Sequence, residues 1–252
     1  MIKVILFGAI SGLSLVFGSS IGTIFHLKQR IIAFFMAFGS GVLICALTFG
    51  LMEEAFRHGG FDAIIIGFLG GGAVFILGDY LVHIRGGRKH KKHQHPISSE
   101  EAEDAKEAKE ANETAITLGV IIDGIPESIA LGVALFANQS LGILMLIAIV
   151  LSNFPEGISS VPGLQKIGFS KTKIFLLWLI VALITVLITV LSFTFLSDLN
   201  LNNLGIIEAF AAGAILAMLA DAMMPEAFED GGAVIGILTV LGFMLAFIIQ
   251  KI

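Results

Sequence analysis

The chain is dominated by long stretches in which nearly every position is apolar. A bilayer crossing needs about 20 mostly apolar residues in a helix, and runs of that length recur along most of the 252 residues. The predicted spans are 2–25, 31–54, 62–84, 115–136, 140–162, 174–197, 205–228 and 232–250. The runs are continuous rather than alternating, which excludes a membrane β-barrel. The pattern therefore predicts an all-α polytopic membrane protein with eight transmembrane helices.

The composition supports this fold class and excludes others. Apolar residues make up 56% of the chain and charged residues 14%, with a mean hydropathy of +0.96, whereas a soluble domain carries roughly 25% charged residues. The apolar content excludes disorder, the single cysteine excludes a disulfide scaffold, and the net charge of −5 excludes nucleic acid as a partner. We expect one transmembrane domain over residues 1–252, with membrane lipid around it. The sequence leaves open whether two copies form a homodimer.

Basic residues are concentrated in alternate connections, which predicts the orientation of the chain. Twelve of the 15 Lys and Arg residues lie in the first, third and fifth connections, which the positive-inside rule places in the cytoplasm. Both termini are therefore expected outside the cytoplasm, in a multi-pass protein of the cell membrane. The one long connection, 85–113, is then a cytoplasmic His-rich and charged loop. It is typical of an anchor for anionic lipid, or of a loop that binds metal through His83, His90, His93 and His95.

Two pairs of segments repeat within the chain. Residues 39–60 align with 211–232 at an offset of 172, with eight of 22 positions identical, and both end in Glu-Ala-Phe-x-x-Gly-Gly. Residues 123–129 align with 152–158 at an offset of 29 and share Pro-Glu-x-Ile. Because the predicted helices of each pair cross the membrane in opposite directions, both repeats are inverted. The sequence thus predicts a 3+2+3 inverted-repeat bundle, an arrangement typical of transporters.

Five carboxylates lie well inside predicted spans that contain no Arg, and no Lys beyond Lys3. They are Asp79, Asp123, Glu127, Glu156 and Asp221. An ionised carboxylate at the bilayer centre costs about 2.5–3.5 kcal/mol even on the most lenient scale. Acids without basic partners must be protonated, or neutralised by a cation that comes and goes. The pattern therefore predicts a cation pathway through the membrane.

The fourth and fifth predicted spans carry the densest polar chemistry. Asp123 and Glu127 are four residues apart, so both project from one helical face. Ser152 and Asn153 lie four and three residues before Glu156 and give that helix a matching polar face. A proline directly before each glutamate frees a backbone carbonyl one turn earlier. These oxygen atoms predict a divalent-cation site near the midplane, with the metal ion as substrate and no organic cofactor.

Here the sequence resembles the ZIP family of divalent-metal (zinc/iron) transporters, and the resemblance covers nearly the whole chain. That family has eight spans, both termini outside, a His-rich cytoplasmic loop after the third span, and Pro-Glu motifs in the fourth and fifth. Residues 152–157, Ser-Asn-Phe-Pro-Glu-Gly, resemble its fifth-span motif, in which a polar residue, Asn or Asp, and Glu ligate metal. The resemblance implies that Glu127 and Glu156 bridge the metal site. It also implies cytoplasmic-side exit ligands near Asp79, Asp221 and Glu226.

The fourth-span motif departs from the family pattern. Residues 123–128 read Asp-Gly-Ile-Pro-Glu-Ser, where the family usually has His-Asn-x-Pro-Glu-Gly. Asp123 thus replaces the histidine and Gly124 the asparagine, and no histidine remains in either central helix. A site made only of oxygen donors is harder in character than zinc prefers. The number of metal ions it holds stays open, and the compact chain favours a bacterial-type member.

We therefore predict a transporter, not an enzyme, that moves Zn/Fe/Mn-type ions into the cytoplasm through a midplane carboxylate site. An alternative is a proton- or sodium-coupled carrier of an organic solute, in which the carboxylates serve coupling. Against it, no deep Arg or Lys could hold an anionic solute and no aromatic cage a cationic one. An intramembrane aspartyl protease using Asp79 with Asp123 or Asp221 would need glycine at Ile76 and does not explain the inverted repeats.

Overall fold

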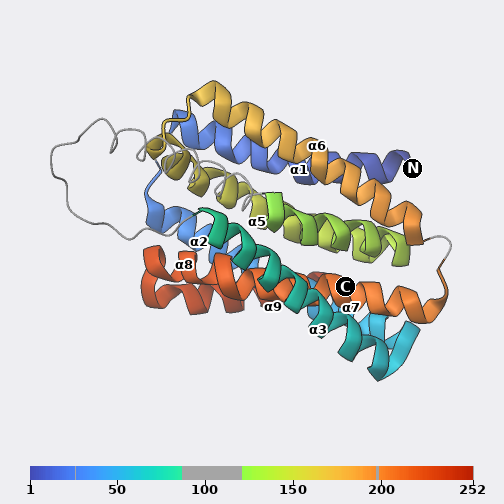
Figure 1. Cartoon of the computed structure of the whole chain (residues 1–252). Coiled ribbons are helices and arrows are strands. Elements are labelled where there is room, and N and C mark those ends of the chain that lie inside the picture. Colours follow the sequence, from blue (N-terminus) through green and yellow to red (C-terminus); the bar gives the residue numbers. More distant parts are fainter. Residues whose placement is uncertain (26, 87–120, 197–198, 252) are drawn as a thin grey trace.

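Every regular element in the described part of the chain is a helix, and the helices lie side by side in one bundle (Figure 1). The computed structural model describes residues 1–25, 27–86, 121–196 and 199–251, with residues 82–86 as backbone only. Within these ranges, five helical stretches are long and apolar enough to cross a membrane: Ile2–Ile24, Gln29–Leu81, Gln139–Lys166, Lys171–Phe195 and Leu201–Lys251. The predicted all-α membrane fold is confirmed at this level.

Three of the helices begin directly after a residue that caps their N-terminus. The elements are α1 (Ile2–Ile24), α2 (Gln29–Ala46), η1 (Leu47–Leu51), α3 (Met52–Gly86), an unlabelled helix over 121–137, α5 (Gln139–Lys166), α6 (Lys171–Phe195), α7 (Leu201–Met218), η3 (Leu219–Met223), α8 (Met224–Gly231), η4 (Gly232–Val234) and α9 (Ile235–Lys251). Asn138, Ser170 and Asn200 precede α5, α6 and α7, and each side-chain oxygen accepts a hydrogen bond from the backbone three residues on. Such caps satisfy amide groups that the first turn leaves unpaired.

The two longest helical stretches are each broken at one glycine. Gly60, within α3, has φ 63°, and Gly232, directly after α8, has φ 68°. Only glycine adopts this backbone region without strain, and the chain turns back at both points in Figure 1. The sequence predicts that the second and seventh spans end at residues 54 and 228. In the structure, the helix continues past both positions to the glycine break. The chain therefore reverses direction at one glycine in each case, where the sequence predicts a short connection.

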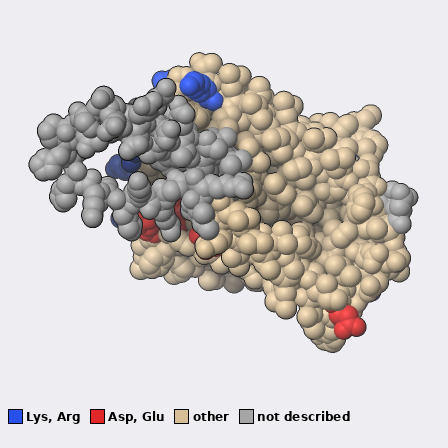
Figure 2. Space-filling view, viewed as in Figure 1, with Lys and Arg blue, Asp and Glu red and all other residues tan. Residues whose placement is uncertain are grey.

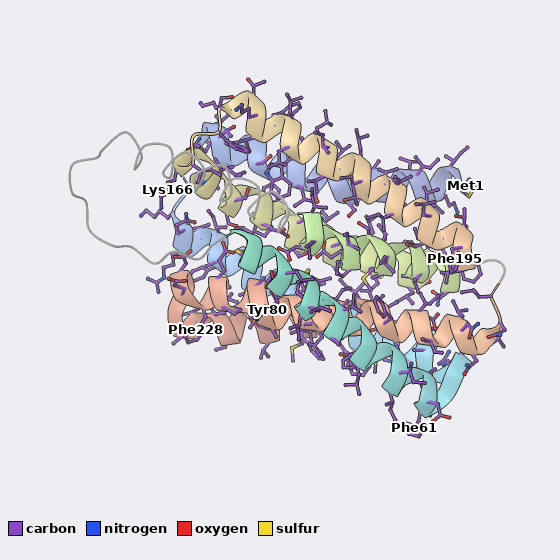
Figure 3. The ribbon with its side chains drawn as sticks, viewed as in Figure 1. Met1, Phe61, Tyr80, Lys166, Phe195 and Phe228 are labelled. Carbon is purple, nitrogen blue, oxygen red and sulfur yellow. The ribbon has the colours of Figure 1, made fainter. Side chains whose placement is uncertain are left out.

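Alternate connections of the chain lie at one end of the bundle. The turns from α1 to α2 and from α5 to α6 lie at the end that carries Lys166 and Phe228, whereas Met1, Phe61 and Phe195 lie at the opposite end (Figure 3). On the face in Figure 2, the Lys and Arg side chains lie toward the Lys166 end. This arrangement agrees with the predicted alternation of basic connections. The predicted His-rich loop over 85–113 lies outside the described residues beyond Gly86, and its histidine side chains are not described.

The helices pack as two groups that meet along α2 and α5. One group contains α1, the 121–137 helix, α5 and α6, and the other contains α2, α3, α7, α8 and α9 (Figure 1). Gly157 lets α5 approach α1 so closely that an added Cβ would lie 2.5 Å from the Leu15 carbonyl oxygen. On the other side of α5, a Cβ on Gly39 of α2 would lie 2.8 Å from the Leu151 carbonyl oxygen. The middle of α5 is thus enclosed between two backbones.

The outer surface of the bundle is apolar. Leu183 and Leu187 of α6 are 63% and 57% exposed, and Ile237 of α9 is 66% exposed. The same helices bury other apolar side chains inside, such as Trp178. Large apolar side chains on the outside match a hydrocarbon environment, as expected of a multi-pass membrane protein.

Candidate metal centre

A hydrogen bond joins the two central helices at the predicted acidic site. Ser152 Oγ of α5 lies 3.0 Å from Glu127 Oε1 of the 121–137 helix and shares its proton with the Ile149 carbonyl, also at 3.0 Å. Ser152 is fully buried, and Glu127 is only 3% exposed. The offset of 29 between the repeated segments pairs Glu127 with Glu156 and Asp123 with Ser152, so this contact joins one residue from each pair.

Asn153 places a third polar group against Glu127. Its amide Nδ2 donates to the Ser11 carbonyl of α1 at 3.4 Å and also lies within hydrogen-bonding reach of Glu127. Its Oδ1 is buried and has no hydrogen-bond partner among the described residues. An unpaired buried amide oxygen costs about 1–3 kcal/mol. This oxygen is therefore available as a metal ligand beside a buried carboxylate.

Glu156 completes the polar face of α5. It lies one helical turn after Ser152 and is half-buried. The carboxylates of Glu127, Asp123 and Glu226 all act on it electrostatically. Residues 121–137 and 139–165 contain no Lys or Arg, so these elements supply no basic partner for the acids. Carboxylates from three elements thus act on one another electrostatically.

Asp123 and Gly124 occupy the start of the described part of the fourth span. Asp123 is half-buried one turn before Glu127 and interacts electrostatically with it. A Cβ added at Gly124 would meet only Val181 Cγ1, at 4.0 Å. Position 124 therefore has room for a side chain although the chain has none there.

Of the three acids predicted as cytoplasmic-side exit ligands, only one is shown to interact with the central acids in the described part of the chain. Glu226 of α8 interacts with the side chain of Ser159, one turn beyond Glu156 on α5, and also acts electrostatically on Glu156. Asp221 is exposed in η3, and Asp79 is half-buried in α3. Neither Asp221 nor Asp79 is among the groups that act most strongly on Glu156.

The centre is built from mixed oxygen donors rather than from a tight cluster of acids. Among the residues described, no three His, Cys, Asp or Glu side chains converge closely enough to hold a metal ion by themselves. A serine hydroxyl and an asparagine amide converge on the Glu127 carboxylate, and Glu156 interacts with Glu127 electrostatically. Carboxylate, amide and hydroxyl oxygens suit hard and borderline divalent cations.

Sequence reasoning missed the part that α1 plays in this centre. The contact from Asn153 to the Ser11 carbonyl depends on how α1 packs, and no motif in α1 indicates it. One signal was present: Gly12 and Gly18 in α1 allow close helix contact, and a Cβ at Gly18 would overlap the Phe154 carbonyl.

A model of a known protein family matches most of the chain. The family model described as ZIP zinc transporter matches residues 82–250, a stretch that includes both central helices and everything after them. No curated protein matches the chain.

Proposed function

The chain belongs to the ZIP zinc transporter family, and we propose that it moves Zn/Fe/Mn-type cations into the cytoplasm through the centre between α5 and the 121–137 helix. Membership in this family makes the chain a multi-pass transporter of divalent metals rather than an enzyme. In the proposed mechanism, the metal ion is the substrate and its ligands are side chains of the two central helices. The proposed ligands are Asp123, Glu127, Ser152, Asn153 and Glu156.

The observation that carries this proposal is the burial of acids to which their own described helices supply no basic partner. Glu127 is 3% exposed, Glu156 is half-buried, and their helices contain no Lys or Arg within the packed region. Removing one partner from a buried charge pair leaves an uncompensated charge that costs several kcal/mol. A divalent cation supplies the missing positive charge only while it is bound. This is the property that a transport site needs, since tight permanent neutralisation would stop release.

The path to the cytoplasm is proposed to continue along Glu226, Asp221 and Asp79. Support is strongest for Glu226, because it interacts with Ser159, one turn beyond Glu156 toward the Lys166 end, and acts electrostatically on Glu156. Asp221 and Asp79 are included because they lie in the seventh and third spans, near the positions where the family resemblance implies exit ligands. We propose that they receive the ion after it leaves the central site.

The proposed topology has eight crossings, 3+2+3 inverted repeats and both termini outside. It is supported by geometry that recurs at the offset of 172: the π-helical turn η1 with η3, and Gly60 with Gly232. A Cβ on Gly41 would overlap Thr239 of α9, and one on Gly213 would overlap Phe68 of α3. The same glycine position thus makes the same kind of close contact in both halves of the chain. The cytoplasmic placement of the Lys166 end rests on the basic connections.

The proposal is tested by uptake of radioactive zinc and manganese into proteoliposomes. Glu127→Gln and Glu156→Gln each keep the side-chain volume but remove a charge and a ligand oxygen. We expect each to lower uptake by about 10–100-fold or more, the range that follows loss of even an indirect partner of a metal site. The control is Asp62→Asn, which removes an exposed acid of α3 and should leave uptake unchanged. Normal uptake by either glutamate variant would refute the proposed site.

A further inference from the structure

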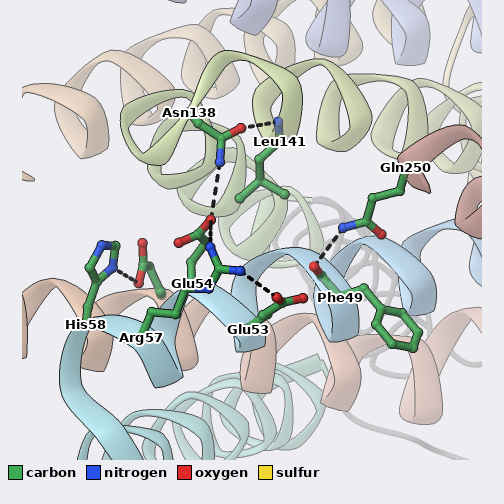
Figure 4. Close-up of polar contacts among 9 residues, drawn as sticks. Phe49, Glu53, Glu54, Arg57, His58, Asn138, Leu141 and Gln250 are labelled. Atoms are coloured by element: carbon green, nitrogen blue, oxygen red, sulfur yellow. Dashed lines mark hydrogen bonds and ion pairs between the residues drawn. The ribbon is translucent and has the colours of Figure 1, made fainter. Parts of the chain in front are cut away.

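A second polar cluster lies at the Met1 end of the bundle (Figure 4). His58 Nδ1 of α3 lies 2.8 Å from Glu208 Oε2 of α7. The Glu208 side chain is fully buried, whereas that of His58 is 21% exposed. The second carboxylate oxygen of Glu208, Oε1, is buried and has no hydrogen-bond partner among the described residues. The pair therefore combines an imidazole that solvent reaches with a carboxylate that keeps one oxygen available.

The nearest permanent positive charge is directed away from this pair. Arg57 Nη2 binds Glu53 Oε1 at 2.8 Å, and Arg57 Nη1 lies 3.8 Å from Glu54 Oε1 (Figure 4). Glu208 is thus paired with an imidazole, which can give up its proton, rather than with a guanidinium, which cannot. An ion pair needed only for packing would be better served by Arg57. Histidine at this position therefore favours a contact in which a metal ion can replace the proton between the imidazole and Glu208.

A cavity lies beside Glu54, on the same helix as His58. Glu54 lies one helical turn before His58 on the same face and acts electrostatically on Glu208. Glu54 also lines a cavity of about 340 Å³ together with Asn138, Ser140 and Gln250. Glu54 therefore lines the cavity and also acts electrostatically on Glu208, so its negative charge favours a cation near both.

We propose that His58 and Glu208 form a second site for a divalent transition-metal ion, an inference that rests on the proposed transport function. Zinc lies about 2.0–2.1 Å from an imidazole nitrogen and about 2.0–2.2 Å from a carboxylate oxygen, so two such ligands on one ion are roughly 3 Å apart. The observed separation of 2.8 Å needs to widen only slightly. When the ion binds, the proton shared by Nδ1 and Oε2 passes to water, and the neutral imidazole and ionised carboxylate become ligands.

This site would select metal ions by a chemistry that the centre lacks. The 121–137 helix and α5 contain no histidine, so the central donors are all oxygen atoms apart from weakly donating amides. Oxygen donors accept Mg²⁺ and Ca²⁺, whereas imidazole favours zinc, iron and copper ions. An imidazole site at the Met1 end selects transition metals before they reach the all-oxygen centre.

The test uses the full chain with His58 as its only histidine. The other five, His26, His83, His90, His93 and His95, are replaced by Asn. With Cu²⁺ as the probe, pulsed electron paramagnetic resonance should detect an imidazole nitrogen coupled to the copper. Adding His58→Asn should abolish this coupling. Copper that binds the single-histidine protein without imidazole coupling would overturn the proposal.

Zinc titrations of the same protein test the carboxylate. Glu208→Gln should weaken zinc binding at this site by at least about 10-fold, and Asp62→Asn, an exposed acid nearby in sequence, should not. Equal zinc affinity in the Glu208→Gln protein would also overturn the proposal. Glu127→Gln should keep the imidazole signal, so failure of the central site and failure of this one are distinguishable. The copper measurement needs no change at Glu208, so instability of that variant does not affect it.

Discussion

At the scale of single residues, Asn153 links the chemistry of the centre to its architecture. Its amide nitrogen is held by the Ser11 carbonyl of α1, which leaves Oδ1 buried beside Glu127 without a partner in the described structure. Glu156 follows three residues later on the same helical face. A cation bound by the two glutamates could therefore also be bound by this amide oxygen. The hydrogen bond to α1 fixes the direction of that oxygen before any metal arrives.

The replacement of His-Asn by Asp-Gly at 123–124 leads to a prediction about selectivity. We expect Asp123→His combined with Gly124→Asn to raise the ratio of zinc to manganese affinity by about tenfold, or about 1.4 kcal/mol. An imidazole favours zinc over manganese more than a carboxylate does. The new Asn side chain fits, because a Cβ at Gly124 would meet only Val181 at 4.0 Å. Calorimetric titration with both metals measures the ratio.

The ratio is the useful quantity because zinc binds nitrogen and oxygen sites more tightly than manganese in nearly any design. The single variant Gly124→Asn is the control, since it adds an amide without an imidazole. An unchanged ratio, with both metals still bound, would mean that Asp123 does not contact the metal. The ion would then depend on Glu127, Glu156 and Asn153.

The sequence identifies the acids of the centre but not all of their partners. Spacing alone places Glu127 and Glu156 on polar helical faces, and the repeat relates these two glutamates across two helices. It does not identify the partner of Glu208, because His58 lies 150 positions away in the chain. Contacts between distant segments depend on packing, and side-chain spacing within one helix carries no information about them.

At the scale of helices, the two halves of the chain break their regular geometry at the same places. The π-helical turns η1 and η3 and the positive-φ glycines Gly60 and Gly232 each recur after 172 positions. A Gly-Gly pair ends both copies of the repeat, but the sequence predicts short connections there rather than a break at one glycine. It does not predict the π-helical turns, which have no distinctive composition. Within η1, the backbone carbonyl of Phe49 accepts a hydrogen bond from the side chain of Gln250 in α9, at 2.7 Å.

Two glycines of α5 should respond in opposite ways to the same substitution. Gly157→Ala places a Cβ 2.5 Å from the Leu15 carbonyl, so α1 must move away from the segment that carries Asn153 and Glu156. We expect it to lower the free energy of unfolding by about 1–3 kcal/mol and to weaken metal uptake. Gly163→Ala meets nothing within 4 Å and should stabilise the helix by about 0.5–1 kcal/mol.

Denaturant titration of the two purified variants, together with uptake assays, measures both effects. Because both are Gly→Ala changes within α5, helix propensity is matched and only the contact with α1 differs. Equal stability and equal uptake in the two variants would show that the close approach of α1 and α5 does not support the centre.

At the scale of the whole molecule, the centre lies in the group of helices formed by α1, the 121–137 helix, α5 and α6. The second group reaches the centre chiefly along α2, where Gly39 meets the Leu151 carbonyl, and through Glu226 of α8. The periodicity of the sequence predicts the helices and their alternating direction. It does not predict which helices pack together, because apolar residues surround each span on nearly every side.

The central claim is that Glu127 and Glu156 bind the transported ion together. Crystals of the protein grown with Zn²⁺, with anomalous diffraction data measured at the zinc absorption edge, test it most directly. We predict an anomalous peak about 2.0–2.2 Å from carboxylate oxygens of both glutamates, with Asn153 Oδ1 among the remaining ligands. Zinc bound only elsewhere, with the hydrogen bond from Ser152 to Glu127 still in place, would contradict this account.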